Sequence, residues 1–324
     1  MNKPRILVVG TAGIELNADI SCIPALSHTQ YEDDGYEYLP GGIGALSAHC
    51  INRLGAESVL CSKLGNDTYG SKLHSIYESC GINTRFITTD NATRTSLNIN
   101  LNEQTHARRT ISYRGASAKV SASDIEDALT CYPDAVLLHF DVPEDTLLFT
   151  VKAARNSENV PLIIVDATPI IPEFPLEALG EIDVFLCNED EALAYTGIKT
   201  NTLDSCLKAC FALSSKVQAN YFIIKLGDRG VFLYDGTYYR LISEYNVEVE
   251  NDYGASDIFT AAFAVEYLRS YNTRRACEFA NVAVAYARSK KGYFDAVPSE
   301  TELKDFIISN NINYHMDTVS TNED

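Results

Sequence analysis

The chain has 324 residues, of which 46% are hydrophobic, and a formal net charge of −18 at pH 7. This length and composition allow a large buried core, in one big α/β domain or in two smaller ones. The negative charge argues against nucleic acid or an anionic membrane as a partner, because either would require a basic surface.

Two features of the sequence predict a cytosolic protein. The N-terminus MNKPRILVVG leads into a strand pattern without the apolar segment of a signal peptide, and no window approaches the roughly 18 apolar residues of a membrane span. The 9 cysteines are scattered from Cys22 to Cys277. An odd number at such spacings fits a reducing compartment better than a disulfide framework.

Apolar runs rich in β-branched residues predict buried strands. In chain order they are ILVVG from Ile6, SVLCSKLG from Ser58, AVLLHF from Ala135, PLIIVD from Pro161, DVFLC from Asp183 and YFIIKLG from Tyr221. The runs do not alternate with polar residues, so we expect both faces of their sheet to be covered. Helical patterns such as ALSAHCINRLG and PEDTLLFTVKAARN lie between them. This alternation predicts an α/β fold with a mainly parallel central sheet flanked by helices.

Two segments depart from this rhythm and predict a small projecting sheet. Residues 17–40, with YEDDGYEYLP, and residues 93–114, with TSLNINLNEQTHARRTISYR, show short alternating patterns around polar turns, as half-exposed antiparallel strands do. Such strands leave a pairing edge, through which a homodimer could form. We expect one domain over residues 1–314, with the two segments as its lid. Residues 315–324 lack apolar content, which predicts a disordered tail.

Five short motifs follow one another along the chain. They are PGGIGALSAHCINRLGA from Pro40, SKLGNDTYG from Ser62, NEDE from Asn188, KLGDRG from Lys225 and NDYGASD from Asn251. In this order and approximate spacing they resemble the ribokinase-like (PfkB) family of carbohydrate kinases, over about residues 5–300. The resemblance implies a three-layer α/β fold with a β-sheet lid. It also implies a kinase that transfers the γ-phosphate of ATP to a hydroxyl of a small sugar or sugar derivative.

The stretch around Gly254 would carry this chemistry. Amides of Gly254, Ala255 and Ser256 at a helix N-terminus would attract a phosphate oxygen, because unpaired N–H groups and the helix dipole both favour an anion. In the family this turn is the anion hole, and Asp257 resembles the catalytic base that takes the proton of the attacking hydroxyl. From the residues alone, the same stretch could simply cap a helix through Asn251 or its neighbour.

The motif NEDE has two interpretations. By resemblance, Asn188 and Glu191 would help to hold Mg²⁺, often through water, which suits a small hard cation with oxygen ligands. From the residues alone, the same pair predicts a helix start, with Asn188 as N-cap and Glu191 completing a capping box.

The resemblance implies further contacts with ATP. Gly227 and Gly230 would let the backbone approach the nucleotide, although a turn between two strands would use the same glycines. Lys225 stands where the family often has threonine or serine, and could contact a nucleotide phosphate or pair with an acid. Asn281, in FANVAVAYA, falls where the family often borders the adenine, and could equally be an ordinary polar residue of a helix.

On the acceptor side, the resemblance implies a sugar site beneath the lid. Gly41 and Gly42 would form the hinge, where missing Cβ atoms allow close approach. Glu15 stands where the family usually has a sugar-binding aspartate, with Asp19 as the alternative if the register shifts. An exposed turn acid would fit the sequence as well. Arg114 would suit a carboxylate or phosphate on the acceptor if it faces inward, whereas arginines on a polar hairpin are most often solvated.

Some positions depart from the family. Leu46 replaces the usual asparagine after the double glycine, which leaves the acceptor open. Asn251 and Asp252 replace an Asp-Thr pair, which leaves a monovalent-cation site in question. Ser256 replaces a glycine but keeps the amide. The alternatives are a nucleoside or sugar-phosphate kinase on the same scaffold and a catalytically degenerate sensor that binds the ligand.

Overall fold

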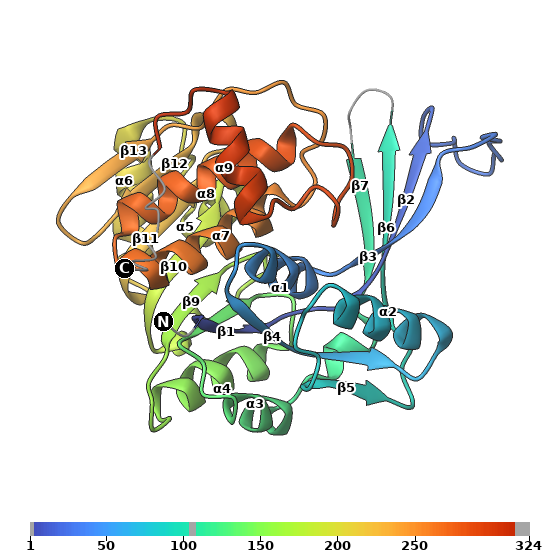
Figure 1. Cartoon of the computed structure of the whole chain (residues 1–324), viewed down its shortest axis with the longest axis horizontal. Coiled ribbons are helices and arrows are strands. Elements are labelled where there is room, and N and C mark those ends of the chain that lie inside the picture. The colour runs from blue at the N-terminus through green and yellow to red at the C-terminus, as the bar shows by residue number, and fades with distance from the viewer. Residues whose placement is uncertain (1–2, 104–107, 315–324) are drawn as a thin grey trace, which may run out of the picture.

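The computed structural model describes residues 3–103 and 108–314, so the tail expected at 315–324 lies outside the described residues. Within them, a 9-stranded sheet forms the centre of the molecule (Figure 1). Its order is β13 (Tyr239–Ile242), β12 (Val231–Tyr234), β11 (Gln218–Lys225), β10 (Glu181–Asn188), β9 (Leu162–Asp166), β8 (Ala135–His139), β1 (Arg5–Val9), β4 (Glu57–Gly65) and β5 (Ile87–Asp90).

The central sheet is mainly parallel, which confirms the prediction. Strands from β5 to β11 run parallel to their neighbours, whereas β12 and β13 are antiparallel at one edge. Each apolar run predicted as a strand is one of the parallel strands. Parallel strands place their carboxyl ends at one edge of the sheet, where ligands bind in open α/β folds.

Helices cover both faces of this sheet and enclose two cores. One face carries α1 (Ile43–Arg53), α2 (Thr68–Ser79), α7 (Ala255–Ser270), α8 (Thr273–Arg288) and α9 (Glu300–Ser309). The other carries α3 (Ala122–Leu129), α4 (Glu144–Arg155), α5 (Glu189–Thr196) and α6 (Leu203–Ser214). In β1, Ile6 and Val8 face the first core, while Leu7 and Val9 face the second. Because both faces are buried, the strands need continuous apolar runs.

A second sheet projects from this body, on the right in Figure 1, and we call it the lid. Its order is β3 (Tyr36–Gly41), β2 (Gly13–Ile20), β6 (Ser96–Glu103) and β7 (Arg108–Tyr113). The outer pairs are antiparallel, as expected, but β2 and β6 pair in parallel. The prediction of antiparallel strands was therefore wrong for the central pair, because that pair joins two segments far apart in the chain.

Short 3₁₀ helices complete the described structure, at Gly115–Lys119, Leu176–Leu179 and Gly227–Arg229. None of the helices within residues 3–103 and 108–314 is long and apolar enough to cross a membrane.

Candidate active site

The N-terminus of α7 is open. Gly254 is its N-cap residue at φ +79°, and no described side chain caps the helix. A Cβ at Gly254 would lie 2.6 Å from Cδ2 of Leu46 and 2.9 Å from Cε2 of Tyr293. Glycine is thus required both by the left-handed backbone and by close packing. The amides of the first turn keep their capacity to bind an anion.

The polar side chains of the loop before α7 bind other groups and do not cap the helix. Oδ1 of Asn251 accepts a hydrogen bond from the amide of Tyr253, at 3.0 Å. Asp252 forms an ion pair with Arg288, with 2.8 Å between Oδ1 and Nε. The alternative that Asn251 or its neighbour caps α7 is therefore wrong.

Asp257 lies in the first turn of α7 and is only 8% exposed. The pKa of its carboxyl is raised well above the usual value, first because burial penalises the charged form and then because Asp166 is a nearby negative charge. The positive charge of Lys225 offsets part of this increase. A buried carboxylate with increased proton affinity is suited to accept a proton.

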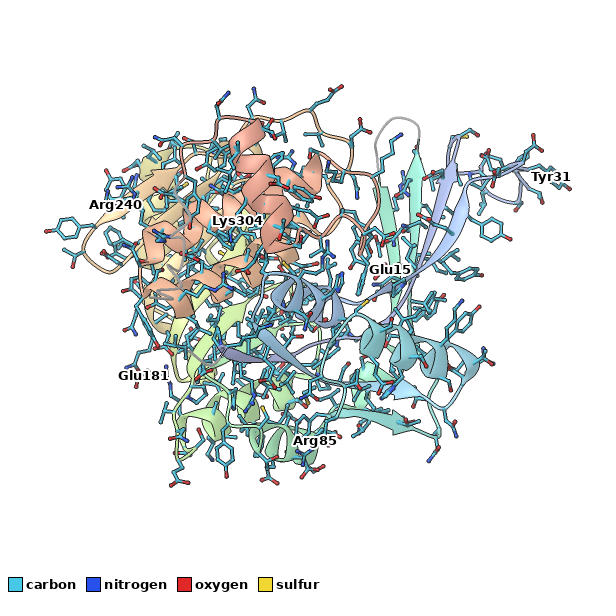
Figure 2. The ribbon with its side chains drawn as sticks, viewed as in Figure 1. Glu15, Tyr31, Arg85, Glu181, Arg240 and Lys304 are labelled. Carbon is cyan, nitrogen blue, oxygen red and sulfur yellow. The ribbon has the colours of Figure 1, made fainter. Side chains whose placement is uncertain are left out.

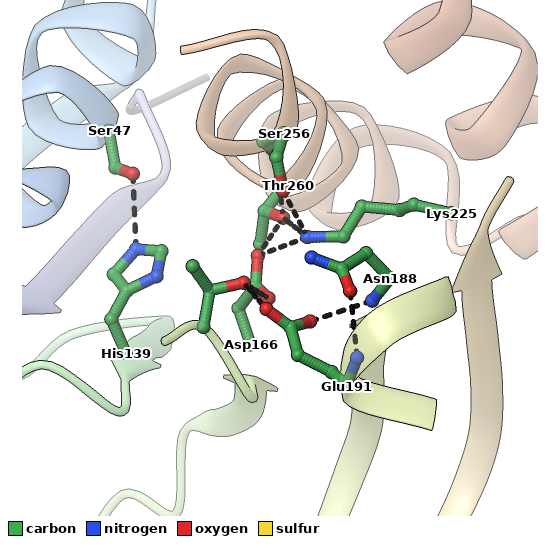
Figure 3. Close-up of polar contacts among 9 residues, drawn as sticks. Ser47, His139, Asp166, Asn188, Glu191, Lys225, Ser256 and Thr260 are labelled. Carbon is green, nitrogen blue, oxygen red and sulfur yellow. Dashed lines mark hydrogen bonds and ion pairs between the residues drawn. The ribbon is translucent and has the colours of Figure 1, made fainter. Parts of the chain in front are cut away.

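Lys225 ends β11 and pairs with an acid, one of the two possibilities expected for it. Its Nζ lies 2.6 Å from Oδ2 of Asp166, 2.7 Å from Oγ of Ser256 and 3.4 Å from Oγ1 of Thr260, as drawn in Figure 3. Burial alone would lower the pKa of Lys225, but the charges of Asp166 and Glu191 raise it, so the ammonium stays protonated.

Asp166 is the partner that the sequence analysis missed. It ends β9 and is fully buried, and its pKa is nevertheless lowered because Lys225 outweighs the cost of burial. The hydroxyl of Thr260 also donates to it. An acid at the carboxyl end of the run PLIIVD could have suggested this position, since such ends line the ligand-binding edge of the sheet.

Asn188 and Glu191 form a capping box at the start of α5, so the prediction of a helix start is confirmed. The amide of Glu191 donates to Oδ1 of Asn188 at 2.9 Å, and the amide of Asn188 donates to Oε2 of Glu191 at 2.7 Å. Thr168 donates to the other carboxylate oxygen at 2.6 Å. Burial raises the pKa of Glu191, against the effect of Lys225.

The role of Asn188 and Glu191 in metal binding stays a prediction. Their side-chain oxygens fit only a limited role as metal ligands. Each oxygen already accepts a hydrogen bond and keeps a second lone pair. No group of three His, Cys, Asp or Glu side chains that could hold a metal occurs among the described residues. The pair therefore fits Mg²⁺ held mainly by phosphate oxygens and waters, as is usual for this ion.

Asn188, Lys225 and Gly227 line one surface cavity of about 560 Å³. Gly227 has φ +59°, and a Cβ there would meet nothing within 4 Å, so its backbone is accessible to a ligand. Gly230 differs, because a Cβ there would lie 2.1 Å from the carbonyl oxygen of Ile242. This glycine serves the tight turn from β11 to β12.

Asn281 lies on α8 and is buried. Its Nδ2 donates to the carbonyl oxygens of Ile242, at 3.3 Å, and Ser243, at 3.0 Å. The side chain thus holds the end of β13 against α8. Its expected place beside the adenine stays a prediction.

Glu15 is buried at the base of the lid, so the interpretation as an exposed turn acid was wrong. It lies on β2, is 1% exposed, and is labelled where the lid joins the main body in Figure 2. Its carboxylate accepts from the amide of Gly42 at 3.2 Å, from Nδ2 of Asn98 at 2.9 Å and from Nδ2 of Asn100 at 2.8 Å. The hydroxyl of Tyr253 donates to it as well.

The double glycine is needed for this arrangement. A Cβ at Gly41 would lie 2.2 Å from Cγ of Glu15. Gly42 is the N-cap of α1 at φ +95°, and a Cβ there would lie 2.5 Å from the carbonyl oxygen of Thr11. Both residues permit the lid base to approach the main body closely.

The two remaining acceptor candidates lie farther out. Asp19 is exposed on the lid and accepts from Nδ2 of Asn102 at 3.0 Å. Arg114 is exposed, and it lines a cavity of about 200 Å³ together with Gly42 and Asn98. The arginine therefore borders a cavity under the lid, where an acidic ligand group could reach it.

Asp141 belongs to the same cavity and was missed by the sequence analysis. It is 5% exposed and accepts from the amide of Thr11 at 2.9 Å. Its other oxygen, Oδ1, is buried without a hydrogen-bond partner among the described residues. Burial raises the pKa of this carboxyl. An unpartnered buried oxygen at a cavity is a position where a ligand hydroxyl would be favourable.

His139 ends β8 near these acids. Its Nε2 lies 3.1 Å from Oγ of Ser47 (Figure 3), and burial lowers the pKa of its ring. The histidine is therefore a packed neutral residue.

Comparisons with known proteins support one family. A family model described as pfkB family carbohydrate kinase matches residues 3–300. The chain is 26% identical over 308 residues to a ribokinase of Arabidopsis thaliana, covering 92% of this chain and 79% of that protein. It is 27% identical over 308 residues to a ribokinase of Bacillus subtilis (strain 168), covering 94% and 99%. The solved structure of Arabidopsis thaliana ribokinase complexed with ribose and ATP has a TM-score of 0.85 at 24% identity, covering 95% and 99%, and confirms the ribokinase-like fold.

Proposed function

Because the chain belongs to the pfkB family of carbohydrate kinases, and is a phosphotransferase with an alcohol group as acceptor, we propose that it transfers the γ-phosphate of ATP to a hydroxyl of a small sugar or sugar derivative. Asp257 is the base of this reaction. The observation that carries the proposal is a buried carboxyl with a raised pKa in the first turn of an uncapped helix.

In this mechanism the acceptor hydroxyl loses its proton to Asp257 as it attacks the γ-phosphate in line, and the bond from the γ-phosphorus to the leaving ADP breaks. The amides of Gly254, Ala255 and Ser256 receive the phosphate oxygens at the N-terminus of α7. A positioned base contributes about 10²- to 10⁴-fold in rate, and positioning and charge neutralisation contribute most of the rest.

The ATP phosphates approach from the cavity lined by Asn188, Lys225 and Gly227. Lys225 supplies a positive charge next to Ser256, and the open backbone at Gly227 admits the nucleotide. Asn188 and Glu191 would help to hold Mg²⁺ together with phosphate oxygens and waters. When bound, this ion neutralises charge on the transferring phosphate. Gly230 and Asn281 keep β12 and β13 in place, and Asn281 borders the adenine.

The acceptor binds in the cavity of about 200 Å³ beneath the lid. The unpartnered oxygen of Asp141 and the donors around Glu15 favour a ligand with several hydroxyl groups. Arg114 borders the same cavity, which supports a sugar acid or a sugar phosphate as the preferred acceptor.

The lid also supports a homodimer. Its exposed apolar side chains lie on the two edge strands, with Tyr36 and Tyr38 on β3 and Ile111 and Tyr113 on β7. Grouped exposed apolar side chains often mark a contact surface. Sedimentation analysis tests this assembly, and a monomer at micromolar concentration would contradict it.

The decisive test of the activity is ADP release from purified protein with ATP, Mg²⁺ and a panel of sugars, sugar acids, sugar phosphates and nucleosides. We expect turnover with small polyhydroxylated acceptors and a loss of about 10² or more in kcat for Asp257→Asn. Asp204→Asn, a matched change at an exposed helix start, should leave kcat unchanged. Ligand binding without ADP release would favour the sensor, and unchanged activity of Asp257→Asn would show that another group is the base.

A further inference from the structure

Tyr253 joins the lid to the loop that precedes α7. Its hydroxyl donates to Oε2 of Glu15 and accepts from Nδ2 of Asn100 at 3.2 Å. Its ring stacks on Tyr293, with 4.3 Å between the ring centroids and 16° between the planes. Tyr293 is buried, and its ring lies so close to Gly254 that a Cβ there would be 2.9 Å from Cε2 of the tyrosine. The ring and the hydroxyl of Tyr253 are therefore both held in place.

With this contact, the hydrogen-bond acceptor positions of the Glu15 carboxylate are all occupied. One oxygen accepts from Gly42 and Asn98, and the other accepts from Asn100 and Tyr253. An ionised carboxylate offers about four lone-pair positions, so these four donors occupy them. A hydroxyl of a bound acceptor could bind Glu15 only by replacing a donor. Tyr253 is the donor that the loop before α7 contributes, and it comes from outside the lid.

Two cavities lie near Tyr253 and its partner Glu15. Asn98, Gly42 and Asp141 line the one of about 200 Å³, whereas Tyr253 and Tyr293 line a second one of about 1080 Å³. Glu15 is bonded to Asn98 toward the first cavity and to Tyr253 toward the second. Typical small-molecule sites measure about 300–1,000 Å³, so the first cavity alone admits only a small acceptor.

We infer that Tyr253 is a specificity-determining residue of the acceptor site. Its hydroxyl takes a position on Glu15 that an acceptor hydroxyl would otherwise use, and its ring separates the small cavity from the large one. The enzyme is thereby restricted to short polyols and short sugar derivatives, and nucleosides or sugars with bulky substituents are excluded. This inference rests on the proposed function, because it assigns the class of acceptor for that same site.

Two variants separate the ring from the hydroxyl. Tyr253→Phe keeps the stack on Tyr293 and removes one donor from Glu15, whereas Tyr253→Ala also removes the ring and, if the inference holds, opens the small cavity toward the large one. Tyr271→Phe is the matched control, because that tyrosine is 71% exposed at the end of α7. The full chain is assayed by ADP release with acceptors of graded size, from short polyols through pentoses and hexoses to nucleosides, and kcat and KM are measured for each.

We expect Tyr253→Ala to raise kcat/KM for bulky acceptors at least about tenfold relative to short ones. One additional methylene group in a substrate pocket changes kcat/KM by roughly 10- to 200-fold. Tyr253→Phe should keep the size limit and change KM more than kcat, in favour of acceptors with an additional hydroxyl. Tyr271→Phe should match the wild type. If Tyr253→Ala does not fold, Tyr253→Phe still tests the role of the hydroxyl.

Equal losses for all acceptors, with their order unchanged, would mean a purely structural role and would overturn the inference while the proposed function stands. Wild-type turnover of nucleosides as fast as of short polyols would overturn it too. If the wild type releases no ADP with any acceptor, the proposed function fails instead. Thermal shift then tests the size limit by itself: nucleosides should stabilise Tyr253→Ala but not the wild type, and equal stabilisation of both would overturn the inference.

Discussion

The ammonium of Lys225 lies 2.7 Å from the hydroxyl oxygen of Ser256, so the end of β11 is tied directly to the first turn of α7. Ser256 precedes Asp257 and contributes one of the amides proposed to bind phosphate. The same ammonium pairs with Asp166, 2.6 Å away. The buried ammonium of Lys225 thus neutralises the charge of Asp166 and places positive charge beside the N-terminus of α7.

Replacing this cation should destabilise the protein. Lys225→Met leaves Asp166 buried without its partner, and breaking a buried pair in this way costs about 3–5 kcal/mol in the free energy of unfolding. Urea denaturation measures the change, and the double variant Lys225→Met/Asp166→Asn should recover part of the loss. Lys208→Met removes an exposed pair with Asp204 and should have no measurable effect. A Lys225→Met protein as stable as the wild type would contradict the buried ion pair.

Asp257→Asn should stabilise the protein at neutral pH while it lowers kcat. The folded-state pKa of Asp257 is raised above its unfolded value, so the unfolded state ionises first as the pH rises. The free energy of unfolding contributed by this group therefore falls as the pH rises from the ordinary carboxyl pKa through the raised one. Urea denaturation at pH 7 and near pH 4 should show a gain for Asp257→Asn at pH 7 that shrinks at pH 4. A loss of stability at pH 7 would show that the charged form is well compensated.

Asn188→Ala should affect both stability and the response to magnesium. Loss of an N-cap typically costs about 0.5–2 kcal/mol of stability. Ser299 caps α9 in the same capping-box geometry, through Ser299 and Glu302, so Ser299→Ala is a matched control that should cost a similar amount. Only Asn188→Ala should raise the Mg²⁺ concentration needed for half-maximal activity. Equal Mg²⁺ curves for the two variants would limit Asn188 to capping.

Gly41→Ala should disturb the acceptor site through Glu15. The added Cβ would lie 2.2 Å from Cγ of Glu15, so the carboxylate must move away from its donors. We expect a large increase in KM for the acceptor with little change in KM for ATP. Gly236→Ala introduces the same methyl group at φ +87° with nothing within 4 Å, and should cost about 1 kcal/mol of stability without changing either KM. An unchanged acceptor KM for Gly41→Ala would place Glu15 outside the acceptor site.

Arg114→Met should discriminate among acceptors. The guanidinium borders the cavity under the lid, where it suits a carboxylate or phosphate group. Its removal should lower kcat/KM for sugar acids or sugar phosphates by about tenfold or more, and leave uncharged sugars nearly unaffected. Arg274→Met, on the exposed surface of α8, serves as the control for the loss of one charge. Equal effects on charged and uncharged acceptors would refute a specific contact.

Several features of the site could not be read from short motifs. The motif NEDE predicts either a helix cap or a metal site. The structure shows that Asn188 and Glu191 cap α5, while metal binding stays a prediction. Asp166 ends the apolar run PLIIVD and Asp141 follows the run AVLLHF, but neither belongs to a motif, so only their place at the carboxyl end of a strand pointed to the ligand-binding edge. Tyr253 lies inside NDYGASD, yet its partner Glu15 is 238 residues away in the sequence.

The sequence by itself determined the layered fold and the family. Continuous apolar runs demand a sheet covered on both faces, and several motifs in a fixed order specify the positions of glycines and acids along the chain. Only the tertiary structure decided which donors surround each carboxylate, because those donors come from separate strands, helices and loops. The proton affinity of Asp257, the charge pairing of Lys225 and the saturation of Glu15 all depend on burial and on neighbours that folding alone brings together.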